Sequence, residues 1–417
     1  VTSLAELIYS DNPESHIQLI DGIYYLINEG DFVALTVSPK NVNDDILELD
    51  ERTTSLHNNV FYNCENITSI LLPRNVTSIG ESAFYSCGKL SSITLPSSLT
   101  SIGGSAFYGC RGLTSITLPS SLTSIGDFAF QSCSGLTSID LPSSLTSIGY
   151  MAFLNSGITT VKYQGIIEKW LEIDIGNLWI GEHDFIVNGE ELTNLVIPEG
   201  ISGIPQNAFV GCSGLTSVVF PSYLTKIEDY AFYDCTGLTS ITFPSSLTSI
   251  GEYAFQDCTS LTKVDLSNCI SLEGIGDSTF EGCSGLTSIT LPSSLTSIGG
   301  SAFYGCRGLK TINFPTNLKS IGALAFENCD RLASLTIPSS VTSIDVNAFY
   351  NCDSLTNIII DSKNIYSAAR SASNCGYILQ NARTVRVLAS IDDGSNTYLN
   401  NNFTKTTDGE YNVYTKN

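Results

Sequence analysis

Apolar and polar residues alternate in a short block that returns every 23 residues along most of the chain. One copy, residues 90–96, reads LSSITLP. Because successive strand residues point to opposite faces, the block predicts a short half-buried strand that ends at the proline, which cannot donate to a strand ladder. A second extended piece at 99–102 and then a turn or single helical turn complete the unit. In this copy the expected inward residues are Leu90, Ile93 and Leu95, and the outward ones are Ser92 and Thr94.

An isoleucine before the turn, replaced by leucine in the first copy, marks the register of the repeat. It falls at Leu56, Ile79, Ile102, Ile125, Ile148, Ile204, Ile227, Ile250, Ile275, Ile298, Ile321 and Ile344. The spacing is 23 except between Ile250 and Ile275, where it is 25, and between Ile148 and Ile204, where it is 56. The longer gap equals two periods plus ten, which indicates one degenerate coil with an insertion. A unit this short cannot bury its apolar face alone, so we predict a solenoid of about thirteen coils.

A phenylalanine at one position of the repeat predicts an aromatic column in the core. Its members are Phe61, Phe84, Phe107, Phe130, Phe153, Phe209, Phe232, Phe255, Phe280, Phe303, Phe326 and Phe349. Stacked coils would place these rings roughly 5 Å apart. The glycine after the marker isoleucine is replaced in other copies by residues such as Pro205 and Glu228, which a left-handed backbone would rarely admit. We therefore expect this glycine to serve close packing.

Eleven of the thirteen cysteines share one repeat position: Cys64, Cys87, Cys110, Cys133, Cys212, Cys235, Cys258, Cys283, Cys306, Cys329 and Cys352. Because every coil offers the same side chain, we interpret the column as buried free thiols that act as small core residues. Disulfides between adjacent coils are the alternative, since the spacing is within reach. Cys269 and Cys375 lie outside the column and are the candidates for special pairing or reactivity.

Three regions depart from the repeat and define the predicted domain organisation. Residues 1–50 and 363–417 are expected to cap the two ends of a solenoid that spans residues 51–362. Residues 162–191 form the degenerate insert.

Within the insert, residues 166–175 predict a short helix around Trp170. Asn188 and Gly189 follow an apolar run and predict a tight hairpin.

The chain is acidic, with a net charge of -22, although charged residues make up only 14% of it. Such a surface repels phosphate, so nucleic acid and anionic membranes are not expected as partners. The longest apolar runs, such as residues 358–360, are far too short to span a bilayer, and no membrane insertion of this segment is expected.

No motif predicts catalysis, a metal site or a cofactor. The three histidines, His16, His57 and His183, are expected at surface or turn positions, and no GxSxG elbow places a serine nucleophile. There is no CxxC pair, and the acidic run at 392–394 is too short for a calcium loop. We predict a protein that is not an enzyme.

The unit LxxIxLPxxLxxIxxxAFxxCxx is intact from Leu113 to Gly135 and resembles the BspA-type, or treponemal-type, leucine-rich repeats. The resemblance covers roughly residues 51–362, and residues 169–198 resemble a degenerate unit of this family. It implies an α/β-type leucine-rich-repeat solenoid dominated by strands. The expected form is a curved right-handed superhelix with a parallel concave sheet and short helical turns or loops on the convex side.

The same resemblance implies a secreted or cell-surface protein, because members of the family are linked with adhesion. Val1 stands where an initiator Met would, which predicts that an upstream segment such as a secretory signal was removed.

The outward strand residues should line the concave sheet and form the first candidate binding surface. The candidates are Thr94, Thr117, Asp140, Thr242, Lys263, Asp265, Thr290 and Asn313. A surface of repeated hydroxyls with little charge is suited to binding an extended protein or a glycan. The structural alternative is that small polar residues simply suit a curved sheet. Ice or crystal-lattice binding fits poorly, because Ser alternates with Thr and an arc is not flat.

Tyrosines beside the Phe column form the second candidate surface. Tyr108, Tyr233 and Tyr304 directly follow the core Phe, and Trp179 lies in the insert. Exposed tyrosine is enriched in recognition surfaces, whereas packing within the loops is the alternative explanation. The predicted function is an adhesin-like extracellular protein that binds a protein or glycan of a host or neighbouring cell. The alternative is a structural spacer within a larger surface protein.

Overall fold

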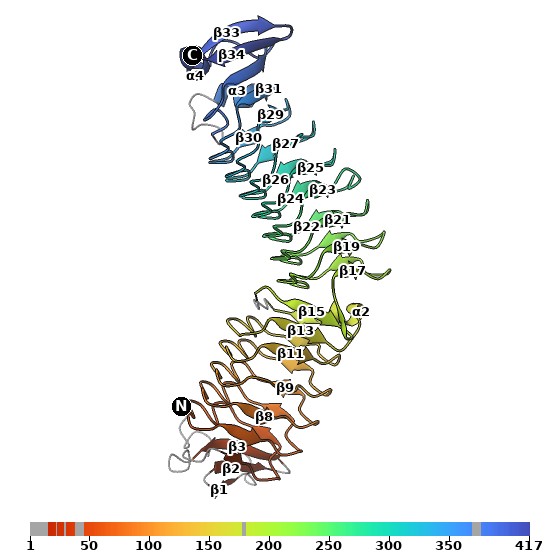
Figure 1. Ribbon diagram of the computed structural model, residues 1–417, viewed down its shortest axis with the longest axis vertical. Helices are drawn as coiled ribbons and strands as arrows, with labels where there is room; N and C mark the ends of the chain where they lie inside the picture. Colours follow the sequence, from red (N-terminus) through yellow and green to blue (C-terminus); the bar gives the residue numbers. More distant parts are fainter. Residues whose placement is uncertain (1–15, 22, 29–30, 38–45, 177–180, 369–376) are drawn as a thin grey trace. The chain divides into compact units, whose positions relative to one another are not determined.

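The computed structural model describes residues 16–21, 23–28, 31–37, 46–176, 181–368 and 377–417. Its internal contacts divide the chain into two compact units, Val1–Glu191 and Leu192–Asn417. We call them unit 1 and unit 2 and describe each by itself (Figure 1).

Both units are stacks of coils, and most coils contribute one strand to a parallel front sheet; the coil at residues 113–135 contributes only the bridge between Thr117 and Asp140. Ser92↔Ser69 and Ser240↔Ser217 are typical pairs, 23 residues apart. The front strands of unit 1 are β4 (Ile46–Glu48), β6 (Ser69–Leu71), β8 (Ser92–Thr94), β11 (Ser138–Leu141), β13 (Thr160–Tyr163) and β15 (Asp184–Val187). Those of unit 2 are β17 (Asn194–Val196), β19 (Ser217–Val219), β21 (Ser240–Thr242), β23 (Lys263–Asp265), β25 (Ser288–Thr290), β27 (Thr311–Ile312), β29 (Ser334–Ile337) and β31 (Asn357–Ile360).

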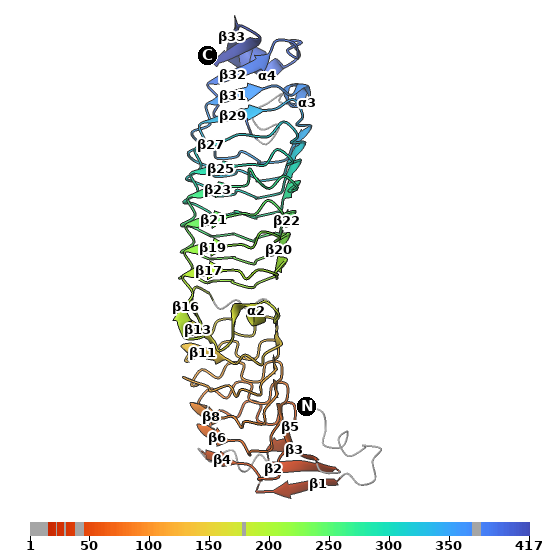
Figure 2. The same ribbon diagram turned by 90° about the vertical axis from the view of Figure 1, so that its right-hand side faces the viewer.

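A second parallel ladder, the side ladder, contains the marker isoleucines. In unit 1 it comprises β5 (Ser55–Leu56), β7 (Ser78–Ile79), β9 (Ser101–Ile102), β10 (Ser124–Ile125), β12 (Ser147–Ile148) and β14 (Asp174–Ile175). In unit 2 it comprises β18 (Gly203–Ile204), β20 (Lys226–Ile227), β22 (Ser249–Ile250), β24 (Gly274–Ile275), β26 (Ser297–Ile298), β28 (Ser320–Ile321) and β30 (Ser343–Ile344). Figure 2 shows the front strands along one side of each unit and the side ladder along the other.

The phenylalanine column is confirmed in both units. Consecutive rings stack with centroids 5.1 Å apart between Phe84 and Phe107 and 5.3 Å apart between Phe232 and Phe255. All members are buried. Each coil therefore extends one continuous aromatic core within its unit.

The marker glycines serve close packing, as expected. A Cβ on Gly103 would lie 2.7 Å from the backbone nitrogen of Glu81, and one on Gly126 would lie 2.5 Å from that of Gly104. The left-handed backbone occurs elsewhere, two residues before and two residues after the core Phe. Around Phe84 these positions are Ser82 (φ 53°) and Ser86 (φ 57°). Two such residues per coil produce a tight turn in place of a convex helix.

The cysteine column is also confirmed as free, buried thiols. Nine of the eleven thiols, all except Cys64 and Cys212, donate to the carbonyl oxygen of the core Phe one coil earlier, as in Cys110 Sγ to Phe84 O at 3.1 Å. Burial raises the pKa of the Cys87 and Cys133 thiols to about 12, so they stay protonated at neutral pH. Cys269 is a free buried thiol as well, and Cys375 lies outside the described residues.

The insert forms the predicted hairpin, but its helix is shorter than the predicted 166–175, because residues 174–175 form strand β14 of the side ladder. Helix α2 (Ile167–Trp170) places Trp170 against Tyr163 and Phe185, with ring centroids 5.2 and 4.8 Å apart. β15 turns into β16 (Glu190–Glu191) through Asn188 (φ 50°) and Gly189 (φ 85°), the two left-handed residues that a type I′ hairpin requires.

One expectation for the insert is wrong. His183 is 4% exposed, and it is neither a surface nor a turn residue. Its Nδ1 lies 2.9 Å from the Gly181 carbonyl oxygen, and burial lowers its pKa. His57, in contrast, is half-buried directly before a turn, and His16 lies in the terminal strand β1.

Antiparallel strands extend each unit at its terminal end. In unit 1, β1 (His16–Ile20), β2 (Ile23–Asn28) and β3 (Asp31–Val37) lead into β5. In unit 2, β31 is followed by α3 (Lys363–Ala368), β32 (Thr384–Leu388), α4 (Thr397–Asn402), β33 (Phe403–Asp408) and β34 (Tyr411–Lys416). The ladders β4–β6 and β31–β32 cross the predicted cap boundaries, and those boundaries stay predictions.

A carboxylate organises the C-terminal strands. Asp392 accepts hydrogen bonds from the Tyr414 hydroxyl at 2.7 Å and the Asn412 amide at 2.8 Å, accepts a third from the Tyr366 hydroxyl, and pairs with Lys405 at 2.8 Å. Burial opposes its ionisation, but Lys405 and the two hydroxyls outweigh burial and lower the pKa of Asp392.

The predicted fold class is confirmed as a strand-dominated solenoid of stacked parallel coils. The right-handed sense of the superhelix stays a prediction.

Candidate ligand-binding surfaces

Many of the repeated hydroxyls serve the scaffold. Ser121 Oγ donates to Leu99 O at 2.6 Å, and Thr123 Oγ1 donates to Thr100 O at 3.0 Å, in each case to the preceding coil. Ser144, Ser246, Thr146 and Thr248 repeat these bonds. The sequence alone did not separate these structural hydroxyls from those available to a ligand.

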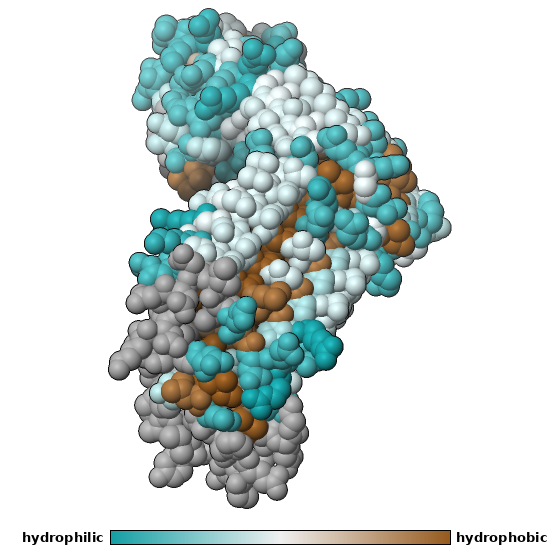
Figure 3. Space-filling model, turned by 60° about the horizontal axis from the view of Figure 1, so that its bottom comes forward, coloured by the Kyte–Doolittle hydropathy of each residue, from teal (hydrophilic) through white to brown (hydrophobic). Residues whose placement is uncertain are grey.

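The hydroxyls at the outward positions of the front sheet are of the second kind, those available to a ligand. Thr94, Thr117, Thr242 and Thr290 are exposed, and none of their hydroxyls bonds to another described residue. In Figure 3, pale bands of intermediate hydropathy run beside a brown, apolar stripe on the face that is shown. The chain therefore offers rows of uncommitted hydroxyls along its front strands.

In unit 1 the structure pairs two of the predicted residues, Thr117 and Asp140, and places Thr94 in a separate ladder. Thr94 pairs with Leu71, which is 60% exposed. Lys162 of the next coil lies 3.5 Å from Asp140 and partly neutralises it.

In unit 2 a longer row contains Thr242, Asp265, Thr290 and Asn313. It begins with Val196 and Val219, which pair with each other and are 63% and 53% exposed. Lys263 stands in the neighbouring row. Hydrogen bonds from the Ser267 hydroxyl and amide lower the pKa of Asp265, which favours its charged form at neutral pH. The apolar pair was missed because valine in an outward position looks like any strand residue.

The tyrosines lie in the turns that follow the side ladder and not on the front strands. In unit 1, Tyr62, Tyr85 and Tyr108 stack face to face with centroids 4.8 and 4.6 Å apart. Tyr304 of unit 2 occupies the same turn position and is half-buried. Trp179, the other predicted residue, lies outside the described residues.

In unit 2, Tyr230 and Tyr253 stack at 4.7 Å beside Tyr233. Burial together with the nearby carboxylates of Asp257 and Asp234 raises the pKa of Tyr233 to about 12. The two tyrosine clusters therefore differ in charge, because this one is surrounded by acids.

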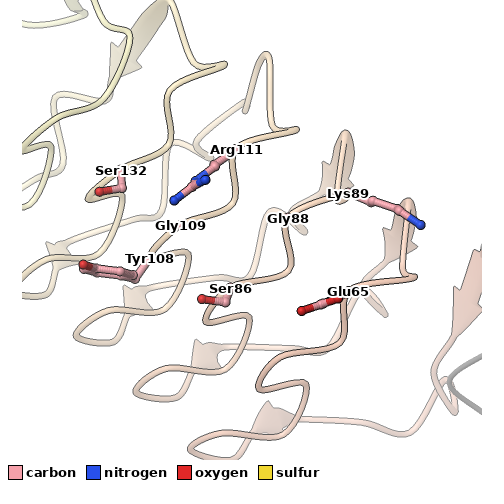
Figure 4. Close-up of a pocket in the computed structure, with 8 residues that line it drawn as sticks. All are labelled: Glu65, Ser86, Gly88, Lys89, Tyr108, Gly109, Arg111 and Ser132. Atoms are coloured by element: carbon pink, nitrogen blue, oxygen red, sulfur yellow. The ribbon is translucent and has the colours of Figure 1, made fainter.

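A groove of about 340 Å³ opens beside the unit 1 tyrosines (Figure 4). It is lined by Glu65, Ser86, Gly88, Lys89, Tyr108, Gly109, Arg111 and Ser132, from four successive coils. Sequence reasoning found Tyr108 but not Lys89 and Arg111. The available signal was their position in adjacent coils of a chain that holds only 19 Lys and Arg.

Within the described residues, no group of three or more His, Cys, Asp or Glu side chains could hold a metal ion. The helices found in that part of the chain are all too short or too polar to cross a membrane.

Stacked 23-residue coils, a parallel front sheet and a phenylalanine core together define a leucine-rich-repeat solenoid. The family model described as BspA type leucine rich repeat region matches residues 54–172, 180–284 and 273–402. The chain belongs to this family.

Solved structures agree with that assignment. A leucine-rich repeat protein from Bacteroides ovatus is 25% identical, with a TM-score of 0.54, over 89% of this chain and 99% of its own. A leucine rich cell surface protein from Faecalibacterium prausnitzii is 24% identical, with a TM-score of 0.55, over 84% of this chain and 95% of its own. No curated protein matches the chain.

Proposed function

We propose that this chain is a non-catalytic, extracellular binding protein that holds a macromolecular ligand against the front sheet of unit 2. The observation that carries the proposal is the row of exposed outward residues that have no role in the scaffold. The hydroxyls of Thr242 and Thr290 bond to no residue that the structure describes, whereas those of Thr239 and Thr287 donate to backbone carbonyls of the preceding coil.

The composition of the row favours a protein ligand over a glycan. Val196 and Val219 offer an apolar contact at one end, and Lys263 and Asp265 offer opposite charges two coils further along. An apolar patch bordered by polar and charged groups is typical of protein interfaces. The location outside the cell is proposed by analogy with the Faecalibacterium prausnitzii cell surface protein.

The test is a panel of extracellular-matrix proteins and a glycan array, probed with the wild-type chain. Val219→Arg and Thr242→Arg place bulky charges in the row without touching the core and should abolish capture. Ser284→Arg is the matched control, because it is exposed in the same unit and Arg307 occupies the equivalent site one coil later. Unchanged capture by the two front-row variants would contradict the proposal.

A spacer role is the second candidate, favoured by the unbroken phenylalanine stack in each unit, which stiffens the coils. If no protein or glycan of the panel binds the chain at a concentration of about tens of micromolar, the result would favour this role.

A further inference from the structure

Residues 92–113 and 288–309 are identical in sequence, one copy in each unit. They build the same turn, since Ser105 and Ser301 have φ of 54° and 52°, and Gly109 and Gly305 have φ of 71° and 69°. Each copy presents a tyrosine and an arginine. Any difference between the two surfaces must come from the adjacent coils.

The adjacent coils place different residues beside the two arginines. In unit 2, Arg307 Nε lies 3.9 Å from Asp330 of the next coil. In unit 1 the residue equivalent to Asp330 is Ser134, which is exposed and uncharged. Neither Arg111 nor Lys89 forms an ion pair with any residue that the structure describes, and Lys89 takes the place of Gly285. In unit 1, Arg111 and Lys89 therefore line the same groove, and neither forms an ion pair with a described residue.

Figure 4 shows how this groove is arranged. The Arg111 side chain extends toward the turns that carry Tyr108 and Ser132, and Ser86 and Glu65 line the earlier coils. A Cβ on Gly88 would meet nothing within 4 Å, so the space above it is open. Tyr108 is the last ring of its stack, since the next coil has Gln131 at this position.

We propose that this groove binds the carboxylate of an acidic sugar. A planar guanidinium such as that of Arg111 holds a carboxylate through two parallel hydrogen bonds. Lys89, whose side chain points away from Arg111, adds a positive charge at the other end of the groove. The hydroxyls of Tyr108, Ser86 and Ser132 and the carboxylate of Glu65 can exchange hydrogen bonds with sugar hydroxyls. A volume of about 340 Å³ suits a small ligand.

The net charge of the whole chain further restricts the class of ligand. A net charge of -22 repels polyanions, so the site favours a single acidic residue in an otherwise neutral glycan. The inference rests on the proposed function in treating the chain as a binding protein, but its site is in unit 1 and is independent of the front row of unit 2.

The test is a titration of the full chain with 3′-sialyllactose, lactose and an acetylated Asp-Glu-Gly amide, followed by NMR. We expect 3′-sialyllactose to bind with a Kd in about the millimolar range and at least about tenfold more tightly than lactose. Arg111→Gln should weaken this binding about tenfold or more. Ser134→Asp should do the same, because it transplants the Arg307–Asp330 pair into unit 1. Arg307→Gln is the matched control and should change nothing.

Absence of saturable binding, equal binding of lactose, or an equal loss in Arg307→Gln would each overturn the proposal. Equally tight binding of the acidic peptide would also overturn it and would mark a peptide site. The front-row variants separate the two proposals: Val219→Arg should retain 3′-sialyllactose binding whether or not it abolishes macromolecular capture. Unchanged thermal melting of Ser134→Asp excludes misfolding as the cause of a loss.

Discussion

The identical stretches 92–113 and 288–309 allow the two units to be compared with sequence held constant. Their interiors agree closely. The ring centroids of Phe107 and Phe130 are 5.2 Å apart, and those of Phe303 and Phe326 are 5.1 Å apart. The thiols of Cys110 and Cys306 donate hydrogen bonds of 3.1 and 3.2 Å to a phenylalanine carbonyl oxygen of the preceding coil. Their surfaces differ, because Arg307 has Asp330 beside it in the next coil, whereas Arg111 has the uncharged Ser134 at the equivalent position. The repeat fixes what is buried, and the adjacent coils decide what the surface can bind.

The largest expected effect tests the shared interior. Phe107→Ala and Phe303→Ala should each lower the free energy of unfolding by about 3–5 kcal/mol, since both leave a large cavity in the aromatic stack. Chemical denaturation of the two variants measures this. Near-wild-type stability of either one, or a clear difference between them, would show that the adjacent coils also govern the core.

The C-terminal strands should respond to acid in a way that the coils do not. Because the folded-state pKa of Asp392 is lowered, its stabilisation is present above the ordinary pKa of an aspartate and is lost as the pH falls below it. Asp392→Asn should remove about 1–3 kcal/mol locally at pH 7. Hydrogen exchange of β33 and β34 at pH 7 and pH 3 measures both effects. Equal protection at the two pH values would contradict this.

The cysteine column offers a smaller test of the same comparison. Cys110→Ala and Cys306→Ala each lose a thiol hydrogen bond and a few atoms of packing, and should cost about 1–2 kcal/mol in either unit.

Alkylation at pH 7 should leave these thiols unmodified in the native protein and label them after unfolding without reductant. Labelling of fewer than about ten thiols in the unfolded chain would point to disulfides instead.

The smallest expected effect tests whether the surface ion pair of unit 2 contributes to the stability of the fold. Asp330→Ser should change the unfolding free energy by less than about 0.5 kcal/mol, because the Arg307–Asp330 pair is exposed and long. The melting temperature checks this. A large loss would mean that the pair supports the fold, and the surface difference between the units would then have a structural cause.

Several elements of the fold could be read from single residues. The outward placement of Thr94, the hairpin at Asn188 and the packing role of Gly103 each follow from one local rule and agree with the structure. The left-handed turn positions were missed, although Asn63, Gly109 and other Asn, Asp, Ser and Gly residues two places after the core Phe were a readable signal.

Other features depended on contacts between coils. The burial of His183 results from packing in the insert, where periodicity gives no guidance. The two classes of hydroxyl look alike in sequence, because Thr94 and Thr100 differ only in whether a carbonyl of the preceding coil is within reach.

By itself the sequence determined the solenoid, its period and its buried columns, because a repeated unit must place the same side chain against its own copy in the next coil. Only the tertiary structure decided which polar side chains are committed to the scaffold, which are exposed, and that Lys89, Arg111 and Tyr108 line one groove. The physical reason is that burial is the same for every copy, whereas charge and hydrogen bonding at the surface depend on the residues that differ between adjacent coils.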